Sequence, residues 1–257
     1  MIKYSLINND CIVAFKDIPD NSIDLVVTDP PYKITKGGCS KIKNGTECGG
    51  FLSKRNSLTQ EHSKNGKLFK HNEIKFSDWV PEVFRVLKDQ SHCYIMVNDR
   101  NMQEILNEGT KAGFKIQNIL IWKKDTHTPN RYYLKNSEFI VMFRKGKAKS
   151  INNMGTKSII EINNIKRGHK QHPTEKPLEL LKLLIDNSSK SEEIVLDPFM
   201  GSGSAGVASI LLDRWFIGIE KDESFFEVAE DRINSVSTLY DNDHQPCNFV
   251  SNQLEAA

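Results

Sequence analysis

The organisation of this chain is clearest in the stretch Ile23-Asp24-Leu25-Val26-Val27-Thr28-Asp29-Pro30-Pro31-Tyr32. The apolar first part predicts a short buried strand, so the last four residues stand where that strand ends. In open α/β sheets, ligands bind outside the carboxyl ends of the strands. The two prolines fix the backbone and donate no hydrogen bonds, which leaves the Asp29 carboxylate and the Pro30 carbonyl as acceptors beside the Tyr32 ring. Such a set suits a planar amino group, for example the exocyclic amine of a nucleobase.

A second apolar run, Glu193 to Leu196, leads into Asp197-Pro198-Phe199-Met200-Gly201-Ser202-Gly203-Ser204-Ala205-Gly206 and then into an apolar helical stretch. This order of strand, glycine-rich turn and helix predicts a ligand cradle, because glycines let backbone N–H groups approach a bound molecule. A third run, Trp215 to Ile219, ends at Glu220. An acidic residue about 20 positions after a glycine turn typically binds ribose hydroxyls.

Together these motifs resemble the S-adenosylmethionine-dependent DNA amino-methyltransferases. Asp-Pro-Pro-Tyr is similar to the catalytic tetrapeptide of that family, and Asp197 to Gly203 resembles its cofactor motif. His172-Pro173-Thr174-Glu175-Lys176-Pro177 resembles the motif that precedes the cofactor half, and Asn9-Asp10-Cys11 stands where related enzymes contact the cofactor adenine. The catalytic motif comes first here, as in the β group of the family. The resemblance covers roughly residues 1–33 and 74–235.

The resemblance implies a Rossmann-like α/β methyltransferase fold with permuted motif order: a mixed, mostly parallel sheet with helices on both faces. It implies S-adenosylmethionine as cofactor and no metal. Phe199 is either core filler or a cofactor contact, and Lys176 is either a solvated lysine or a residue near the cofactor carboxylate or the target loop. The implied catalytic residues are Asp29, Pro30, Pro31 and Tyr32, and the implied cofactor-binding residues are Asp10, Cys11, Asp197, Phe199, Gly201, Gly203, Glu220 and Lys176.

Two other kinds of site compete with this interpretation. The spacing of Gly201, Gly203 and Gly206 also matches a dinucleotide fingerprint, but such a match alone is weak. The residues Asp197 to Phe199 lengthen the turn, and too little chain follows Glu220 to complete a dinucleotide half. A zinc site from Cys39, Cys48, His62 and His71 is disfavoured because the spacings fit no compact finger.

The net charge of +2 is unevenly distributed along the chain. Residues 33–75 hold 10 Lys or Arg against 3 Glu, and residues 143–171 hold 8 against 1, so each segment carries +7 while the remainder carries −12. Solvated lysine-rich loops would account for this, but beside a base-binding motif we expect two phosphate-binding segments on double-stranded DNA. The candidate DNA contacts are Lys41, Lys43, Lys54, Arg55, Arg144, Lys145, Lys147 and Arg167.

A chain of 257 residues can bury one sizeable core. We expect a single methyltransferase domain over residues 1–236, with a mobile basic insertion at 33–75, a short target-recognition segment at 144–171 and a polar tail at 237–257. No apolar run is long enough for a membrane span and no leader is present, and the five cysteines are scattered, so a cytoplasmic protein is expected, in a bacterial, archaeal or phage context. The short recognition segment and the resemblance favour a homodimer.

The pattern of apolar residues predicts an alternation of strands and helices. Strands are expected at 23–28, 93–97, 193–196 and 215–219, and an antiparallel pair at the sheet edge from 116–122 and 138–143. Helices are expected at 77–87, 101–112, 177–187 and 223–236. The segment 144–171 is expected to be irregular.

These features predict a DNA adenine-N6 methyltransferase of the restriction-modification type that acts on a flipped-out base. A cytosine-N4 enzyme shares the fold and mechanism, but its first motif residue is more often serine than aspartate. A non-catalytic DNA-binding protein on the same fold is a further alternative, against which the intact Asp29 and Tyr32 argue.

Overall fold

The computed structural model describes residues 3–31, 74–128, 132–165 and 175–243, without the side chains of 239–243. Residues 1–30 and 76–257 form one compact unit, and residues 31–75 form a second. Tyr32, the candidate contacts Lys41, Lys43, Lys54, Arg55 and Arg167, and the mobility expected of 33–75 lie outside the described residues.

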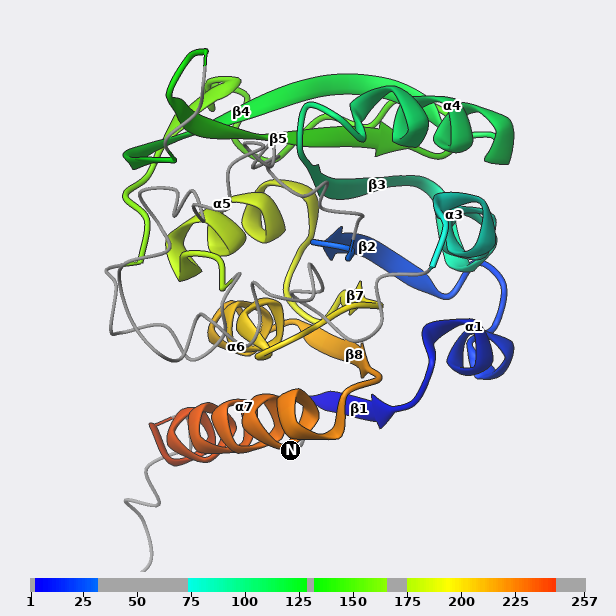
Figure 1. Cartoon of the computed structure of the whole chain (residues 1–257). Coiled ribbons are helices and arrows are strands. Elements are labelled where there is room, and N and C mark those ends of the chain that lie inside the picture. Colours follow the sequence, from blue (N-terminus) through cyan, green and yellow to red (C-terminus); the bar gives the residue numbers. More distant parts are fainter. Residues whose placement is uncertain (1–2, 32–73, 129–131, 166–174, 244–257) are drawn as a thin grey trace, which may run out of the picture. The chain divides into compact units, whose positions relative to one another are not determined.

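The larger unit is built on one mixed sheet in the order β1-β8-β7-β2-β3-β5-β4-β6 (Figure 1). All neighbouring pairs are parallel except the two that involve β5, which runs against both β3 and β4. The mostly parallel sheet expected from the sequence is therefore confirmed. Its strands are β1 (Tyr4–Asn8), β2 (Ile23–Thr28), β3 (Leu87–Val97), β4 (Lys115–Thr128), β5 (Lys135–Arg144), β6 (Ile159–Glu161), β7 (Ile194–Asp197) and β8 (Trp215–Glu220).

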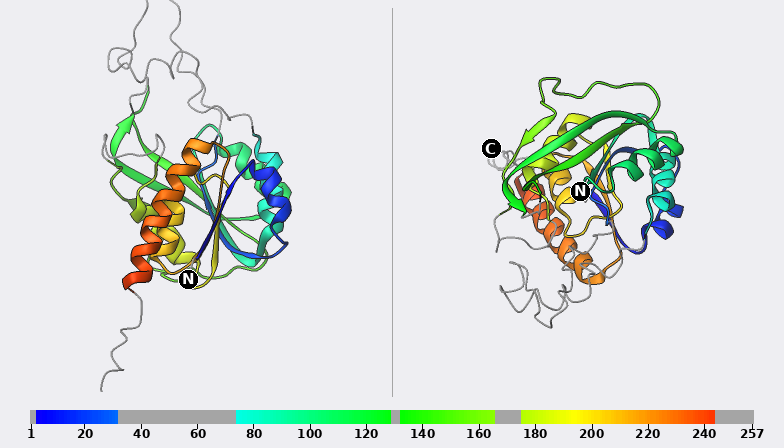
Figure 2. Two further views of the ribbon diagram at one scale, coloured as in Figure 1. Left: turned by 90° about the horizontal axis from the view of Figure 1, so that it is seen from below. Right: turned by 45° about the horizontal axis from the view of Figure 1, so that its top comes forward.

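Helices cover both faces of this sheet (Figure 2). The first face carries α1 (Cys11–Ala14), the short 3-10 helix η1 (Phe15–Asp17), α3 (Phe76–Val86) and α4 (Met102–Ala112). The second face carries α5 (Leu178–Ser188), α6 (Ser204–Leu211) and α7 (Glu223–Asp243). The central strands are buried on both sides, as the unbroken apolar run Leu25 to Val27 requires, with each of these side chains at 0% exposure.

Most predicted elements lie where the apolar pattern indicated. The helix expected at 101–112 ends at Gly113, whose positive φ of 108° is the left-handed conformation that favours glycine at a helix end. The antiparallel pair expected at 116–122 and 138–143 is β4 with β5. No helix in the described ranges is long and apolar enough to cross a membrane.

Three element predictions were wrong. Helix α7 extends to Asp243, beyond the end expected at 236, because its buried stripe of Ala229 and Ile233 continues to Ser237. Strand β3 begins at Leu87 rather than Cys93, since Leu87 pairs with Ile23 of β2 and the polar residues that follow form a bulge before His92 pairs with Leu25. The segment 144–171 is not irregular throughout, because β6 pairs in parallel with β4 and forms the sheet edge.

Candidate active site

Three acidic side chains meet where neighbouring strands β8, β7 and β2 end. Glu220 and Asp197 are the last residues of β8 and β7, and Asp29 directly follows β2. The Thr28 hydroxyl donates to Asp197 Oδ1 at 2.7 Å and so ties two of these strand ends together. Burial raises the pKa of Asp197 to about 7, and the carboxylates of Asp29 and Glu220 add to the rise. This edge therefore concentrates negative charge where little water reaches it.

The glycine-rich turn after β7 is held by these same carboxylates. Asp197 Oδ1 accepts from the Phe199 N–H at 3.0 Å, and Glu220 Oε2 accepts from the Gly201 N–H at 3.0 Å. Gly201 and Gly203 have φ values of 52° and 77°, the left-handed region that side chains other than glycine rarely adopt. The sequence is thus fitted to a tight, pre-formed turn that leads directly into α6.

Gly203 has a second reason to lack a side chain. It caps the amino end of α6, and an added Cβ would lie 2.9 Å from the Ala229 Cβ of α7. The close approach of α6 and α7 behind the turn therefore fixes where the turn points. Phe199 is half-buried and packs edge-on against Trp79 of α3, with ring centroids 5.1 Å apart. It takes part in packing and still presents some surface at the edge.

The segment Asn9-Asp10-Cys11 reaches the same edge through the pairing of β1 with β8. The Asn9 N–H donates to the Glu220 carbonyl at 3.1 Å. Asp10 caps α1 by accepting from the Ile12 N–H at 2.9 Å, and its other oxygen pairs with Lys221 at 2.8 Å. Burial raises the pKa of the Cys11 thiol to about 12, so this side chain is a neutral packing residue.

Asp29 presents one engaged and one unengaged oxygen. Its Oδ2 pairs with the Lys176 ammonium, while its Oδ1 is buried and has no hydrogen-bond partner among the described residues. Burial raises the pKa of Asp29, and the Lys176 charge opposes the rise. A buried acceptor without a partner is costly, so this atom is suited to receive a hydrogen from a molecule that binds there.

Lys176 also faces Glu138, a residue that the sequence analysis did not single out. Its Nζ lies 3.5 Å from Glu138 Oε2, and Lys124 Nζ lies 2.8 Å from Glu138 Oε1. Burial alone would raise the pKa of Glu138, but the two lysines outweigh burial and lower it. The only signal in the sequence was an acidic residue at the head of an otherwise apolar strand.

Arg232 of α7 is a second residue that sequence reasoning missed. Its guanidinium donates to the Ser202 carbonyl at 2.6 Å and pairs with Glu175 at 2.8 Å. It therefore joins the glycine-rich turn to the residue next to Lys176. A helical arginine with no motif around it gives no signal of this kind in a single sequence.

The basic residues Arg144, Lys145 and Lys147 lie away from this edge. Arg144 pairs in register with His92, and the chain then continues toward the amino ends of the parallel strands. The Lys145 ammonium donates to the carbonyls of Phe84 and Leu87, at 2.7 Å each. Lys145 therefore stabilises the core, and its expected phosphate contact stays a prediction. Phosphate contacts by Arg144 and Lys147 stay predictions, and their position distant from Asp29 weakens them.

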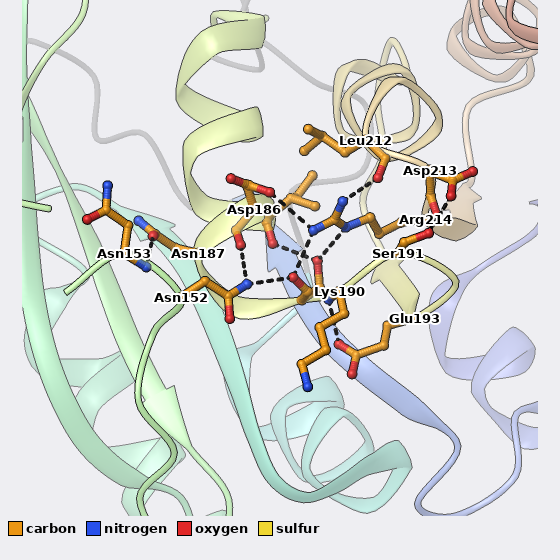
Figure 3. A network of polar contacts seen from close by, with 12 residues as sticks. Asn152, Asn153, Asp186, Asn187, Lys190, Ser191, Glu193, Leu212, Asp213 and Arg214 are labelled. Carbon is orange, nitrogen blue, oxygen red and sulfur yellow. Dashed lines mark hydrogen bonds and ion pairs between the residues drawn. The ribbon is translucent and has the colours of Figure 1, made fainter. Parts of the chain in front are cut away.

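A polar network holds the residues that follow Lys147 to the end of α5, away from Asp29 (Figure 3). The Asn152 amide donates to the carbonyls of Asp186 and Ser189, at 2.6 and 2.8 Å, where α5 ends. Arg214 donates to the same Ser189 carbonyl at 2.8 Å and pairs with Asp186. The first part of the predicted recognition segment is thus anchored to the core. Just after β6, the described residues Ile162 and Asn164 donate backbone N–H groups to Lys123 and Asp125 of β4.

The fold and this acidic, glycine-lined edge define a Rossmann-like methyltransferase. A family model described as DNA methylase, for N6 and N4 enzymes, matches residues 23–231, and the chain belongs to this family. The family transfers a methyl group from S-adenosylmethionine to an amino group of a DNA base.

Similar proteins agree with this assignment. The type II methyltransferase M2.MboI of Moraxella bovis is 29% identical over 261 residues, which cover 93% of this chain and 91% of that protein. The M1.HpyAVI–SAM complex has a TM-score of 0.64 at 24% identity, over 89% of this chain and 99% of that one. The cytosine-N4-specific PvuII DNA methyltransferase has a TM-score of 0.68 at 16% identity, over 94% and 93%. The two structural likenesses show the fold.

Proposed function

We propose that this protein is a site-specific DNA adenine-N6 methyltransferase in which Asp29 accepts a hydrogen from the amino group of a flipped-out adenine. The observation that carries the proposal is the buried Oδ1 of Asp29, which has no hydrogen-bond partner among the described residues. An amino hydrogen would satisfy this oxygen. Its place at the carboxyl end of a central strand, beside the glycine-rich turn, is where such a sheet binds its ligands.

The chemistry requires that the amino nitrogen be made nucleophilic. Its lone pair is delocalised into the ring, so Asp29 and the Pro30 carbonyl each accept one hydrogen and favour a tetrahedral nitrogen. This interaction must be stronger in the transition state than in the ground state to accelerate transfer. A base inside a duplex is out of reach, so it must leave the stack, and Tyr32 supplies a ring against which it packs. S-adenosylmethionine supplies an activated methyl group on a cationic sulfur.

The residues at the neighbouring strand ends fit that donor. The carboxylates of Asp197 and Glu220 complement a cationic sulfonium, and the positive φ values of Gly201 and Gly203 bring backbone close to a ligand. Two oxygens of Glu220 already accept backbone N–H groups, at 3.0 Å from Gly201 and 2.8 Å from Asp222. A carboxylate has about four acceptor sites, so ribose hydroxyls still find room on Glu220. Asp10, Cys11, Phe199 and Lys176 complete the proposed cofactor surroundings.

Adenine is preferred over cytosine because the first residue of the catalytic motif is aspartate. The cytosine-N4-specific PvuII enzyme shares the fold, so the fold does not distinguish the two bases. The cytosine-N4 reaction is therefore the second candidate.

The proposed role of Asp29 is tested by tritiated-methyl transfer to DNA with Asp29→Asn. This variant keeps the shape but loses the charged acceptor, so turnover should fall by about 10²–10³-fold while calorimetry finds unchanged S-adenosylmethionine affinity. The matched control is Asp99→Asn, which removes an exposed carboxylate paired with Lys135 just after β3 and should retain full turnover. An Asp29→Asn enzyme with near-normal turnover would overturn the catalytic assignment.

The aromatic ring of Tyr32 gives an independent test. Tyr32→Ala should lose about 1–3 kcal/mol of stacking on the flipped base, whereas Tyr32→Phe should keep most of the activity. A phenylalanine variant as inactive as the alanine variant would show that the hydroxyl is required. Homodimer formation stays a prediction, and light scattering that detects only monomer, with and without DNA, would remove it.

A further inference from the structure

Four charged side chains of alternating sign form a row that ends at Asp29. Lys124 of β4 contacts Glu138 Oε1 at 2.8 Å, and Glu138 Oε2 lies 3.5 Å from the Lys176 ammonium. Lys176 in turn pairs with Asp29 Oδ2. The two lysine side chains are only 11% and 10% exposed, so water screens these charges weakly. The row links strands β4 and β5 to the start of α5 and the end of β2.

We propose that Glu138 is a positioning residue that takes over the Lys176 ammonium when the target amino group occupies Asp29. This inference rests on the proposed function, because it requires Asp29 to accept a substrate hydrogen.

Such an exchange is needed because Asp29 is already paired with Lys176. An ammonium held on Oδ2 withdraws part of the negative charge that would polarise the substrate amine. Moving Lys176 away without a second partner would leave an uncompensated buried charge, which is strongly unfavourable. Glu138 removes that obstacle, because its Oε2 faces Lys176 already.

The observed distances show that Glu138 is close to Lys176 but does not yet hold its ammonium in a charged hydrogen bond. At 3.5 Å the contact between Lys176 Nζ and Glu138 Oε2 is too long for a charged hydrogen bond, which has a length of about 2.7–2.9 Å. A shift of less than about 1 Å would complete it and loosen the contact to Asp29. Lys124 occupies the other oxygen, Oε1, so it keeps Glu138 ionised without blocking the approach of Lys176.

The proposed exchange predicts how the loss of each partner changes the pH dependence of activity, which a purely structural role would leave unchanged. The described charged groups that face Asp29 are Lys176, Glu138 and Lys124, with Asp197 beyond Thr28. Without Lys176, Asp29 would stand desolvated among carboxylates, which raises its pKa and moves the acid limb of activity to higher pH. Without the Glu138 charge, the Asp29 pKa falls and Lys176 stays on Asp29, so turnover drops with no upward move of that limb.

The test compares Lys176→Gln, Glu138→Gln and the control Lys123→Gln by kcat and KM from about pH 5 to pH 9. Lys123 is the neighbour of Lys124, is half-exposed and pairs with Glu161, so its loss should leave the pH profile unchanged. Glu138→Gln should lower kcat by at least about tenfold with KM for DNA unchanged. Lys176→Gln should move the acid limb upward by about one pH unit or more.

Thermal unfolding shows whether each variant is folded, and calorimetry with S-adenosylmethionine shows whether it still binds the cofactor. If Glu138→Gln fails to fold, Lys124→Gln replaces it. Without Lys124, Glu138 should attract Lys176 more strongly and weaken the pairing of Lys176 with Asp29. The acid limb of activity should then move to higher pH, but by less than in Lys176→Gln. A wild-type kcat in folded Glu138→Gln, or a wild-type acid limb in folded Lys176→Gln, with an inactive Asp29→Asn enzyme, would overturn this inference alone. An active Asp29→Asn enzyme would overturn the proposed function itself.

Discussion

Asp197→Asn should make the protein more stable at neutral and alkaline pH. The Asp197 side chain is only 6% exposed, and its Oδ1 accepts hydrogen bonds from Thr28 at 2.7 Å and from Phe199 at 3.0 Å. An asparagine can present its amide oxygen to both donors without carrying a charge. What the substitution removes is the cost of ionising a buried carboxyl beside two other carboxylates.

The sign and size of this effect follow from the raised pKa of Asp197. Burial raises that pKa from 3.8 to about 7, so the native state binds the proton more tightly and stability falls as pH rises between these values. At about 1.4 kcal/mol per pH unit, the full cost above neutral pH is about 4 kcal/mol, of which about 2.5 kcal/mol develops between pH 5 and pH 8. The stability gain from Asp197→Asn should therefore grow by this amount over that range.

Urea unfolding followed by circular dichroism at pH 5 and pH 8 measures this difference. Asp99→Asn is the control, because the hydrogen bond from Lys135 lowers the pKa of this exposed carboxylate and gives it stability that is lost only as pH falls through that pKa. Its small effect should not change between the two conditions. A free-energy difference for Asp197→Asn that is the same at both pH values would refute the reasoning.

Four further outcomes are expected. Glu220→Ala should weaken S-adenosylmethionine binding in calorimetry. It should also lower the unfolding free energy by about 1.5–3 kcal/mol, because the Glu220 carboxylate accepts from the Gly201 N–H. An unchanged unfolding free energy would contradict that anchoring role. Gly206→Ala should cost about 1–3 kcal/mol in urea unfolding, since the new Cβ would lie 2.4 Å from Ile233 Cδ1. Lys145→Met should destabilise the fold but leave the salt dependence of DNA binding unchanged, and a flatter salt dependence would show that Lys145 also contacts phosphate. Neutralising the four basic insertion residues Lys41, Lys43, Lys54 and Arg55 should weaken binding to all DNA sequences and flatten the salt slope by about 0.9 per lost contact, as measured by fluorescence anisotropy.

Motifs made of contiguous residues were predictable from the sequence. The strand before Asp29 and the turn from Asp197 to Gly203 combine an apolar run with rigid or flexible backbone residues, and both signals are local. Parallel strands end at one edge, and the pairing of β7 with both β2 and β8, which the sequence did not predict, then brings Asp29, Asp197 and Glu220 together.

Contacts between distant residues were not predictable in this way. Glu138 and Lys176 meet only because the antiparallel strand β5 brings its first residues to the edge where α5 begins. Arg232 reaches the glycine-rich turn across the packing of α6 and α7. The charge pattern likewise gave no sign that Lys145, within a basic segment, donates to backbone carbonyls of the core.

The central claim is tested most directly by mass analysis of nucleosides from DNA incubated with the protein and S-adenosylmethionine that carries a deuterated methyl group. The account predicts labelled N6-methyladenine with the wild-type protein and with Asp99→Asn, and almost none with Asp29→Asn. Labelled N4-methylcytosine in its place, or label that persists at the wild-type level in Asp29→Asn, would contradict it.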